Sequence, residues 1–136
     1  MLALFPNMTV RADTHADVLD LIASMTAALS DNNAPGFLKA LDKATPGYDH
    51  LREAIPALLA QGDIASSIQP LRDDGDETRR NVDLDWYLEI RNPNETAPVI
   101  RRRQVIRCTV EKRNGHWRIT SLDPLSFFEP ENFAHK

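Results

Sequence analysis

Residues 82–91 read Val-Asp-Leu-Asp-Trp-Tyr-Leu-Glu-Ile-Arg, a strict alternation of apolar and polar side chains. Successive side chains of a β-strand point to opposite faces, so this alternation predicts a strand with one buried face. The apolar members are Val82, Leu84, Trp86, Leu88 and Ile90. The polar members are Asp83, Asp85, Tyr87, Glu89 and Arg91. This stretch predicts a β-sheet in the second half of the chain.

Turn signals on both sides of this stretch extend the sheet. Asn114-Gly115 favours a tight hairpin turn, which would join a strand over residues 100–112 to another over residues 116–121. Asp74-Gly75 would join a strand over residues 64–71 to the one that begins at Val82. The sequence therefore predicts four antiparallel strands that follow one another as a meander.

The turns also predict which residues pair. A two-residue loop at Asn114-Gly115 pairs Glu111 with Arg118, Val110 with Ile119, and Thr109 with Thr120. A loop centred on residues 95–96 predicts a second set of pairs: Glu89 with Arg103, Asp85 with Arg107, Trp86 with Ile106, Leu84 with Cys108, and Val82 with Val110. Opposite charges then share one face, and apolar partners share the other.

Three helices are predicted before the sheet. Val18, Ile22, Met25 and Leu29 recur at helical spacing after Thr14 and Asp17, which resemble a capping box near Asp13. Asn33 is expected to cap a short second helix that carries Phe37, Leu38 and Leu41. Asp49 is expected to cap a third, which is bent at Pro56 and closed by Gly62.

Composition limits the class of protein. The chain has 136 residues, 42% hydrophobic and 26% charged, with a net charge of −4. These values are typical of a globular domain and give no overall basic field for nucleic acid. Its single cysteine, Cys108, rules out a disulfide within the chain. No apolar run reaches the length of a membrane span, and residues 1–10 make no convincing leader. The compartment stays open: cytoplasmic, or exported if a leader has been removed.

Three N-terminal helices followed by a long meander that ends in Leu122-Asp123-Pro124-Leu125-Ser126-Phe127-Phe128 resemble the nuclear transport factor 2-like superfamily. The segment 37–48 and the strand with Asp85-Trp86 are similar to a bacterial branch whose role is not established. The resemblance implies a cystatin-like α+β domain over residues 13–128, with tails at 1–12 and 129–136. Helices would cover the concave side of the curved sheet and enclose a cone-shaped pocket. Two subunits would meet on its outer side.

The predicted inward face has few polar members. It contains no carboxylate and no histidine, whereas isomerases and dehydratases with this fold need a base in the pocket. Arg102 and Gln104 are its polar exceptions. In one interpretation both lie at the pocket mouth, where Arg102 holds the carboxylate or phosphate of a ligand. In the other, Arg102 lies beyond the core and its guanidinium is in water. We expect Trp86, Arg102, Gln104 and Tyr48 to contact a small, largely apolar ligand.

Two other groups of residues invite a functional reading. Arg101, Arg103 and Arg107 would face Arg91, Glu89 and Asp85, so we predict no nucleic-acid partner and instead a homodimer through this face. Tyr48, Asp49 and His50 form the only close cluster with acid–base potential, although a helix cap at Asp49 and an exposed first-turn position for His50 explain these two residues better than a catalytic role. Histidine spacing predicts no metal site, and no cofactor is expected.

Three hypotheses follow from the sequence. The first is a non-catalytic module that binds a small apolar ligand in the cone. The second is a homodimeric scaffold whose cone is filled by its own side chains. The third is an isomerase- or hydratase-type enzyme that uses Tyr48, Asp49 or His50. The sequence identifies neither a ligand nor a reaction.

Overall fold

Four antiparallel strands form one sheet in the order β1-β2-β3-β4, as the turn signals predict. The strands are β1 (Asp63–Gly75), β2 (Arg79–Arg91), β3 (Ile100–Arg113) and β4 (His116–Asp123). Three helices precede them: α1 (Pro6–Ser30), α2 (Ala34–Lys39) and α3 (Tyr48–Leu59). A short 3₁₀ turn, η1 (Leu125–Phe128), follows β4. This computed structural model describes residues 6–94, 96 and 98–131, without the side chains of residues 6–13.

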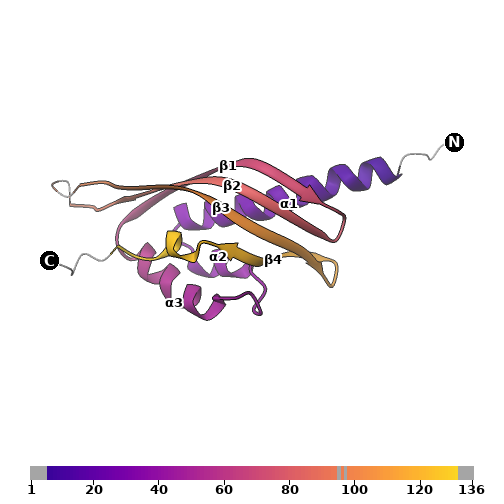
Figure 1. The fold of residues 1–136 in the computed structure, drawn as a ribbon. Coiled ribbons are helices and arrows are strands. Elements are labelled where there is room, and N and C mark those ends of the chain that lie inside the picture. Colours follow the sequence, from indigo (N-terminus) through magenta and orange to yellow (C-terminus); the bar gives the residue numbers. More distant parts are fainter. Residues whose placement is uncertain (1–5, 95, 97, 132–136) are drawn as a thin grey trace.

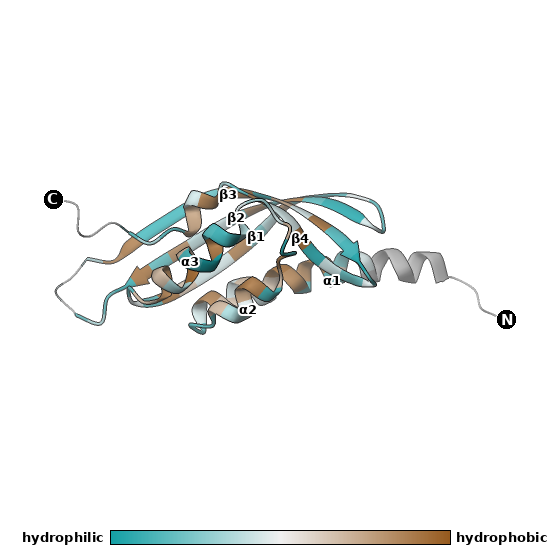
Figure 2. Cartoon of the chain, turned by 90° about the horizontal axis from the view of Figure 1, so that it is seen from below, coloured by the Kyte–Doolittle hydropathy of each residue, from teal (hydrophilic) through white to brown (hydrophobic). Residues whose placement is uncertain are grey.

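The sheet and the helices form two layers, with all three helices on one side of the sheet (Figure 1). Hydrophobic and hydrophilic segments alternate along the strands (Figure 2). The core between the layers contains Trp86, Phe37 and Phe128, none of which is exposed to solvent. The predicted α+β class with three N-terminal helices is confirmed. None of the described helices combines the length and the apolar character needed to cross a membrane.

The start of α1 differs from the prediction, whereas the cap of α2 agrees with it. Helix α1 begins at Pro6 instead of near Asp13, because proline suits a first turn and no breaker follows it. Thr14 therefore lies inside the helix, where it is buried, and does not cap it. Asn33 caps α2 as predicted, with its Oδ1 accepting from the Gly36 amide at 3.0 Å.

Gly47, not Asp49, occupies the cap position of α3. The backbone at Gly47 has a φ of 81°, which glycine adopts without steric cost. A Cβ at this position would also collide with the side chain of Leu125. Asp49 therefore sits in the first turn of the helix. The prediction of Asp49 as the cap was wrong, because the left-handed backbone at Gly47 already starts the helix at Tyr48.

The register of β3 and β4 follows the Asn114-Gly115 turn for part of its length. Glu111 pairs with Arg118, and Val110 pairs with Ile119, as predicted. A bulge after Val110 then places Thr109 opposite Ser121, so the predicted Thr109–Thr120 pair is wrong. The same bulge puts Leu122, and not Ser121, beside the buried Cys108.

The register of β2 and β3 differs from the prediction by two residues. Glu89 pairs with Arg101, Asp85 with Val105, Trp86 with Gln104, Leu84 with Ile106, and Val82 with Cys108. An even shift preserves the face of every side chain, so the buried and charged faces are as predicted. The partners differ because the connection between Arg91 and Ile100 lacks a short turn signal that would fix its centre.

A second bulge lies in β1, between Pro70 and Arg72. The strand continues to Gly75, beyond its predicted end at residue 71. Asp73 consequently pairs with Val82, and its side chain is only 7% exposed. The expectation that the inward face has no carboxylate was therefore wrong. A one-residue insertion changes the face of every later side chain, and alternation alone does not reveal it.

Candidate functional site

The cone mouth, which we define as the end of the inward face around Trp86, Arg102 and Gln104, is occupied by the chain's own aromatic rings. The Trp86 ring lies 5.1 Å from Phe128 and 6.3 Å from Phe127, centroid to centroid. Phe128 also lies 5.4 Å from Phe37. The Trp86 indole nitrogen donates to Ser66 Oγ at 2.8 Å. Trp86 is therefore a satisfied core residue in this structure, with no exposed surface.

Arg102 is half-buried and binds the segment that follows η1. Its Nη2 and Nε donate to a Glu131 carboxylate oxygen at 2.7 and 3.2 Å, and its Nη1 donates to the Phe127 carbonyl at 2.8 Å. The side-chain amide of Gln61 makes two hydrogen bonds with the backbone of Glu131, at 2.6 and 2.8 Å. This double attachment holds the segment against the cone mouth. Gln104 is exposed on the same strand.

Tyr48 does not join the other three predicted ligand contacts. It lines a hollow on the outside of the molecule, between α2, the start of α3 and β4. Its sequence neighbours also diverge: the His50 ring nitrogen lies 3.0 Å from Glu129, and Asp49 lies 3.6 Å from Arg52. The Tyr48-Asp49-His50 cluster therefore does not converge on one point.

A cluster that sequence reasoning missed joins α1 to β1 and β2. His15 Nδ1 lies 2.5 Å from Asp73 Oδ2, and Arg80 Nε donates to Asp73 Oδ1 at 2.6 Å. Arg80 is 16% exposed, whereas the His15 side chain is 53% exposed. A carboxylate on Nδ1 leaves the other ring nitrogen free to accept or donate a proton, the arrangement found in histidine bases. No sequence signal marked this cluster, because the bulge that turns Asp73 inward leaves no trace in the alternation of β1.

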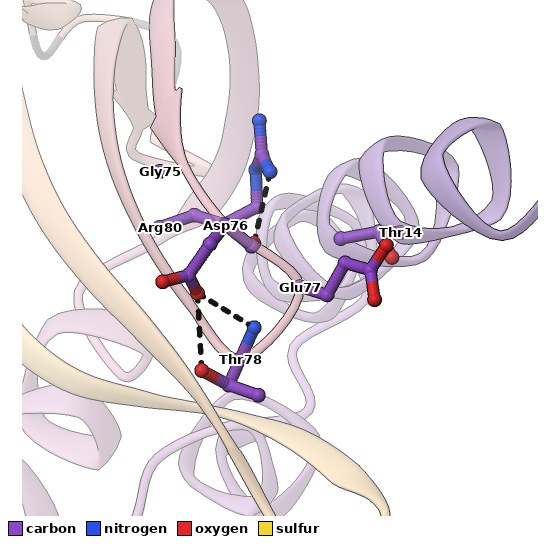
Figure 3. A pocket seen from close by; sticks show the side chains of 6 residues that line it. All are labelled: Thr14, Gly75, Asp76, Glu77, Thr78 and Arg80. Atoms are coloured by element: carbon purple, nitrogen blue, oxygen red, sulfur yellow. Dashed lines mark hydrogen bonds between the residues drawn. The ribbon is translucent and has the colours of Figure 1, made fainter. Parts of the chain in front are cut away.

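The turn between β1 and β2 borders a hollow of about 700 Å³ beside this cluster. Its lining comprises Thr14, Gly75, Asp76, Glu77, Thr78 and Arg80. Glu77 reaches across toward Thr14, while Asp76 bonds to Thr78 (Figure 3). The amides of Thr78 and Arg79 both donate to the Asp76 carboxylate at 2.8 Å, which lowers its pKa. These bonds fix the shape of the turn. No group of three potential metal ligands occurs in the described part of the chain.

The outer face, which we define by the polar side chains of β2 and β3, carries two rows of opposite charge. Asp83, Asp85 and Glu89 lie along β2, and Arg101, Arg103 and Arg107 lie along β3. Cross-strand ion pairs link Arg103 with Asp85 at 2.7 Å, Arg101 with Glu89 at 3.6 Å, and Arg107 with Asp83 at 3.9 Å.

Contacts on the outer face shift the pKa values of its side chains. Hydrogen bonding from Arg103 lowers the pKa of Asp85. The Tyr87 hydroxyl donates to Glu89 at 2.5 Å, which lowers the pKa of Glu89 and raises that of Tyr87. On β3, a hydrogen bond from Thr120 similarly lowers the pKa of Glu111. Asp85, Glu89 and Glu111 therefore keep their negative charge to lower pH than ordinary carboxylates do.

Comparisons by sequence identify no relative. No protein-family model matches the chain. No curated protein matches it at a significant level.

Comparisons by structure find many similar chains. A scytalone dehydratase-like protein from Novosphingobium aromaticivorans has a TM-score of 0.74 at 13% identity, over 85% of each chain. Hexachlorocyclohexane dehydrochlorinase LinA-type3 from Novosphingobium barchaimii has a TM-score of 0.68 at 15% identity, over 85% of this chain and 88% of that one. A nuclear transport factor 2-like superfamily protein from Salmonella enterica serovar Typhimurium has a TM-score of 0.69 at 11% identity, over 90% and 95%.

These similar structures include enzymes as well as proteins without a stated activity. The similarity therefore supports the fold of this chain and does not indicate an activity. Their identities are low, but the TM-scores extend over most of both chains. Helix order and sheet order agree with the resemblance that the sequence indicated. The chain has the cystatin-like α+β fold of the nuclear transport factor 2-like superfamily.

Proposed function

We propose that this protein is an interaction domain that forms a homodimer through the outer face of its sheet. The observation that carries the proposal is the filled interior: Trp86 is fully buried against Phe127 and Phe128, where a cone ligand would lie. A domain whose interior is occupied can still offer its surface to a partner. This supports the scaffold hypothesis over a small apolar ligand inside the cone.

The charge rows of the outer face favour a particular dimer. A two-fold axis that runs parallel to the strands, between β2 and β3, brings β2 of one copy over β3 of the other. Glu89 then faces Arg101 of the partner subunit, and Asp83 faces Arg107 of the partner subunit. An axis perpendicular to the strands would instead oppose acidic rows to acidic rows. Electrostatic complementarity therefore selects the first arrangement.

The size of the face also fits. The four strands of the sheet contain 13, 13, 14 and 8 residues, and at about 3.4 Å per residue and about 4.8 Å per strand the outer side of the whole sheet covers roughly 800 Å² per subunit. Val105 is 45% exposed in the middle of the basic row and provides an apolar contact. Because each arginine on this face keeps an acidic neighbour, the face does not repel its own copy.

Charge exchange tests the proposal. The double variant Arg101→Glu/Arg103→Glu makes the β3 row mostly acidic, like the β2 row, and Asp85→Arg/Glu89→Arg makes the β2 row mostly basic, like the β3 row. Each variant alone should dimerise at least tenfold more weakly, while an equimolar mixture should restore the dimer, as measured by light scattering and sedimentation. Lys39→Glu/Lys43→Glu, on the helical side, is the matched control and should leave the dimer unchanged.

Two results would overturn this function. The first is a wild-type chain that remains monomeric at about 100 μM, where even a weak specific interface is populated. The second is a mixture that associates no better than either variant alone. Far-UV circular dichroism should confirm that all variants are folded, because exposed ion pairs contribute only about 0–1 kcal/mol each to stability.

A second candidate function is binding of a small carboxylate at the cone mouth by Arg102, with Trp86 and Gln104 beside it. The observation that favours it is the Glu131 carboxylate, which Arg102 already holds through two nitrogens. A ligand carboxylate would compete with Glu131 for the same guanidinium. Glu131→Gln should then tighten benzoate binding, and Arg102→Gln should abolish it, in calorimetric titrations. Equal affinity of both variants and the wild type would eliminate this candidate.

A further inference from the structure

The hollow beside Tyr48 concentrates positive charge that has no internal partner. Its volume is about 680 Å³, and its charged lining includes Lys39, Lys43 and Arg118. Among the described residues, only four lysine and arginine side chains take no part in an ion pair: Lys39, Lys43, Lys112 and Arg118. Three of these four therefore surround one hollow, in a chain whose net charge is −4.

The single acid of the lining is already engaged elsewhere. The Asp42 carboxylate lies 3.6 Å from Arg113 and accepts from the Ala44 amide at 2.8 Å. It holds the loop after α2 and faces a cation outside the hollow. Lys39, Lys43 and Arg118 against Asp42 leave the lining with three positive charges and one negative charge, a net charge of +2. An anion entering the hollow would supply the missing charge.

The rest of the lining is apolar or aromatic. Leu41 is 4% exposed, and its backbone pairs with Ile119 on the edge of β4, which makes this part of the floor rigid. Leu38, Pro35 and the half-buried Tyr48 complete the walls. A floor of this kind favours a ligand with a hydrophobic body, because a bare inorganic ion gains nothing from it.

A neighbouring hollow of about 400 Å³ extends the surface. It shares Lys39 and Arg118 with the first, and Leu21 and Ala28 of α1 form its other wall, with the carboxylate of Asp31 at its border. The two shared cations thus stand between two partly apolar depressions. An elongated ligand could place its charged group at Lys39 and Arg118 and its body in either depression.

We propose that this surface site binds a small amphipathic anion, an acyl or aryl group that carries a carboxylate or a phosphate. Arg118 can contact two oxygens of such a group, while the two lysines act as point charges. The hollow lies between α2, the start of α3 and β4, outside the cone and separate from Arg102, and Arg118 on β4 stands opposite Glu111 at the border of the outer face. Since the cations are partly exposed, binding weakens as salt rises.

Binding to the full chain is measured by amide chemical shifts in NMR titrations with octanoate, octan-1-ol, phenyl phosphate, phenol and inorganic phosphate. Octanoate and phenyl phosphate should shift signals in residues 35–48 and 117–119. Each neutral analogue, and inorganic phosphate, should bind at least tenfold more weakly. Lys39→Gln, Lys43→Gln and Arg118→Gln should each weaken binding at least threefold, whereas Lys112→Gln should not, because the fourth cation without an ion pair lies over the Trp117 ring and outside the hollow.

Several outcomes overturn the proposal. These are no binding of either anion, equal binding of octanoate and octan-1-ol, equal weakening by Lys112→Gln, or shifts centred on Arg102 instead of Arg118. The last result would support the carboxylate site at the cone mouth. Inorganic phosphate binding as tightly as phenyl phosphate would show a simple charge patch with no role for the apolar floor.

Discussion

Arg103 binds Asp85 diagonally across β2 and β3: the residue opposite Arg103 is Tyr87, yet its guanidinium donates to both oxygens of Asp85. The pair is partly exposed, with Arg103 70% and Asp85 19% accessible. A double-mutant cycle of Asp85→Ala and Arg103→Ala should give the small coupling energy that is typical of an exposed ion pair in urea unfolding. A much larger coupling energy would mean that the pair is shielded from water, for example inside a dimer.

Lowering the pH should destabilise the fold, because it protonates carboxylates of the outer face. Asp85, Glu89 and Glu111 have lowered pKa values in the folded chain, whereas the ordinary values are 3.8 for aspartate and 4.5 for glutamate. The unfolded chain therefore binds protons at higher pH than the folded one, so the stabilisation is complete above these values and is lost as the pH falls through and below them. Thermal unfolding between pH 3 and about 7 should show this decline. A melting temperature that is flat below pH 5 would contradict it.

Replacing Asp73 should cost more stability than replacing its neighbour Asp74. Asp73→Asn removes the charge that faces the half-buried Arg80 and also weakens the contact with His15, at an expected cost of roughly 2–4 kcal/mol. Asp74→Asn affects an exposed pair with Arg72 and should cost clearly less stability than Asp73→Asn. Chemical denaturation of both variants provides the comparison. Equal costs would show that Asp73 gains nothing from its buried position.

The two tryptophans should respond differently to phenylalanine. Trp86→Phe loses the hydrogen bond to Ser66 and opens space beside Phe128, whereas the buried Trp117 nitrogen has no partner among the described residues. Trp86→Phe should therefore destabilise by about 1–3 kcal/mol more than Trp117→Phe. Guanidinium unfolding followed by circular dichroism avoids reliance on the altered fluorescence. A larger loss for Trp117→Phe would contradict the assignment of Trp86 as the central core residue.

Cys108 should be inert in the native chain. Burial raises the pKa of its thiol to about 12, so almost no thiolate forms at pH 8. Labelling by a disulfide reagent at that pH should proceed only through unfolding and should accelerate in step with added urea. Rapid labelling without denaturant would show that the strand around Cys108 opens locally.

The parts of the fold that sequence reasoning predicted depend on local chemistry. The alternation around Trp86 determines which side chains are buried, and Asn114-Gly115 determines how β3 and β4 begin to pair. The connection after Arg91 has no comparable turn chemistry, so its centre, and with it the β2–β3 register, was misjudged. The buried side chains of β2 and β3 were still predicted correctly, because a register error of two residues leaves every side chain on the same face of the sheet.

The candidate sites depend on contacts between distant residues, which alternation does not encode. His15 meets Asp73 across 58 positions, and only after a bulge has turned Asp73 inward. Glu131 reaches Arg102 across 29 positions from a segment expected to be a tail. The positive hollow likewise gathers Lys39 and Arg118 from α2 and β4. Individually each residue looks like an ordinary surface charge.

Both irregularities in the strand ladder fall on the outermost strands. Leu71 has no partner in the β1–β2 register, and Thr120 has none in the β3–β4 register. The edge of β4 that does not face β3 also makes a backbone bridge, between Ile119 and Leu41. An uninterrupted outer strand is a template on which further chains can add without limit, as in fibrils. These interruptions oppose such open-ended growth and leave association to closed, face-to-face contact.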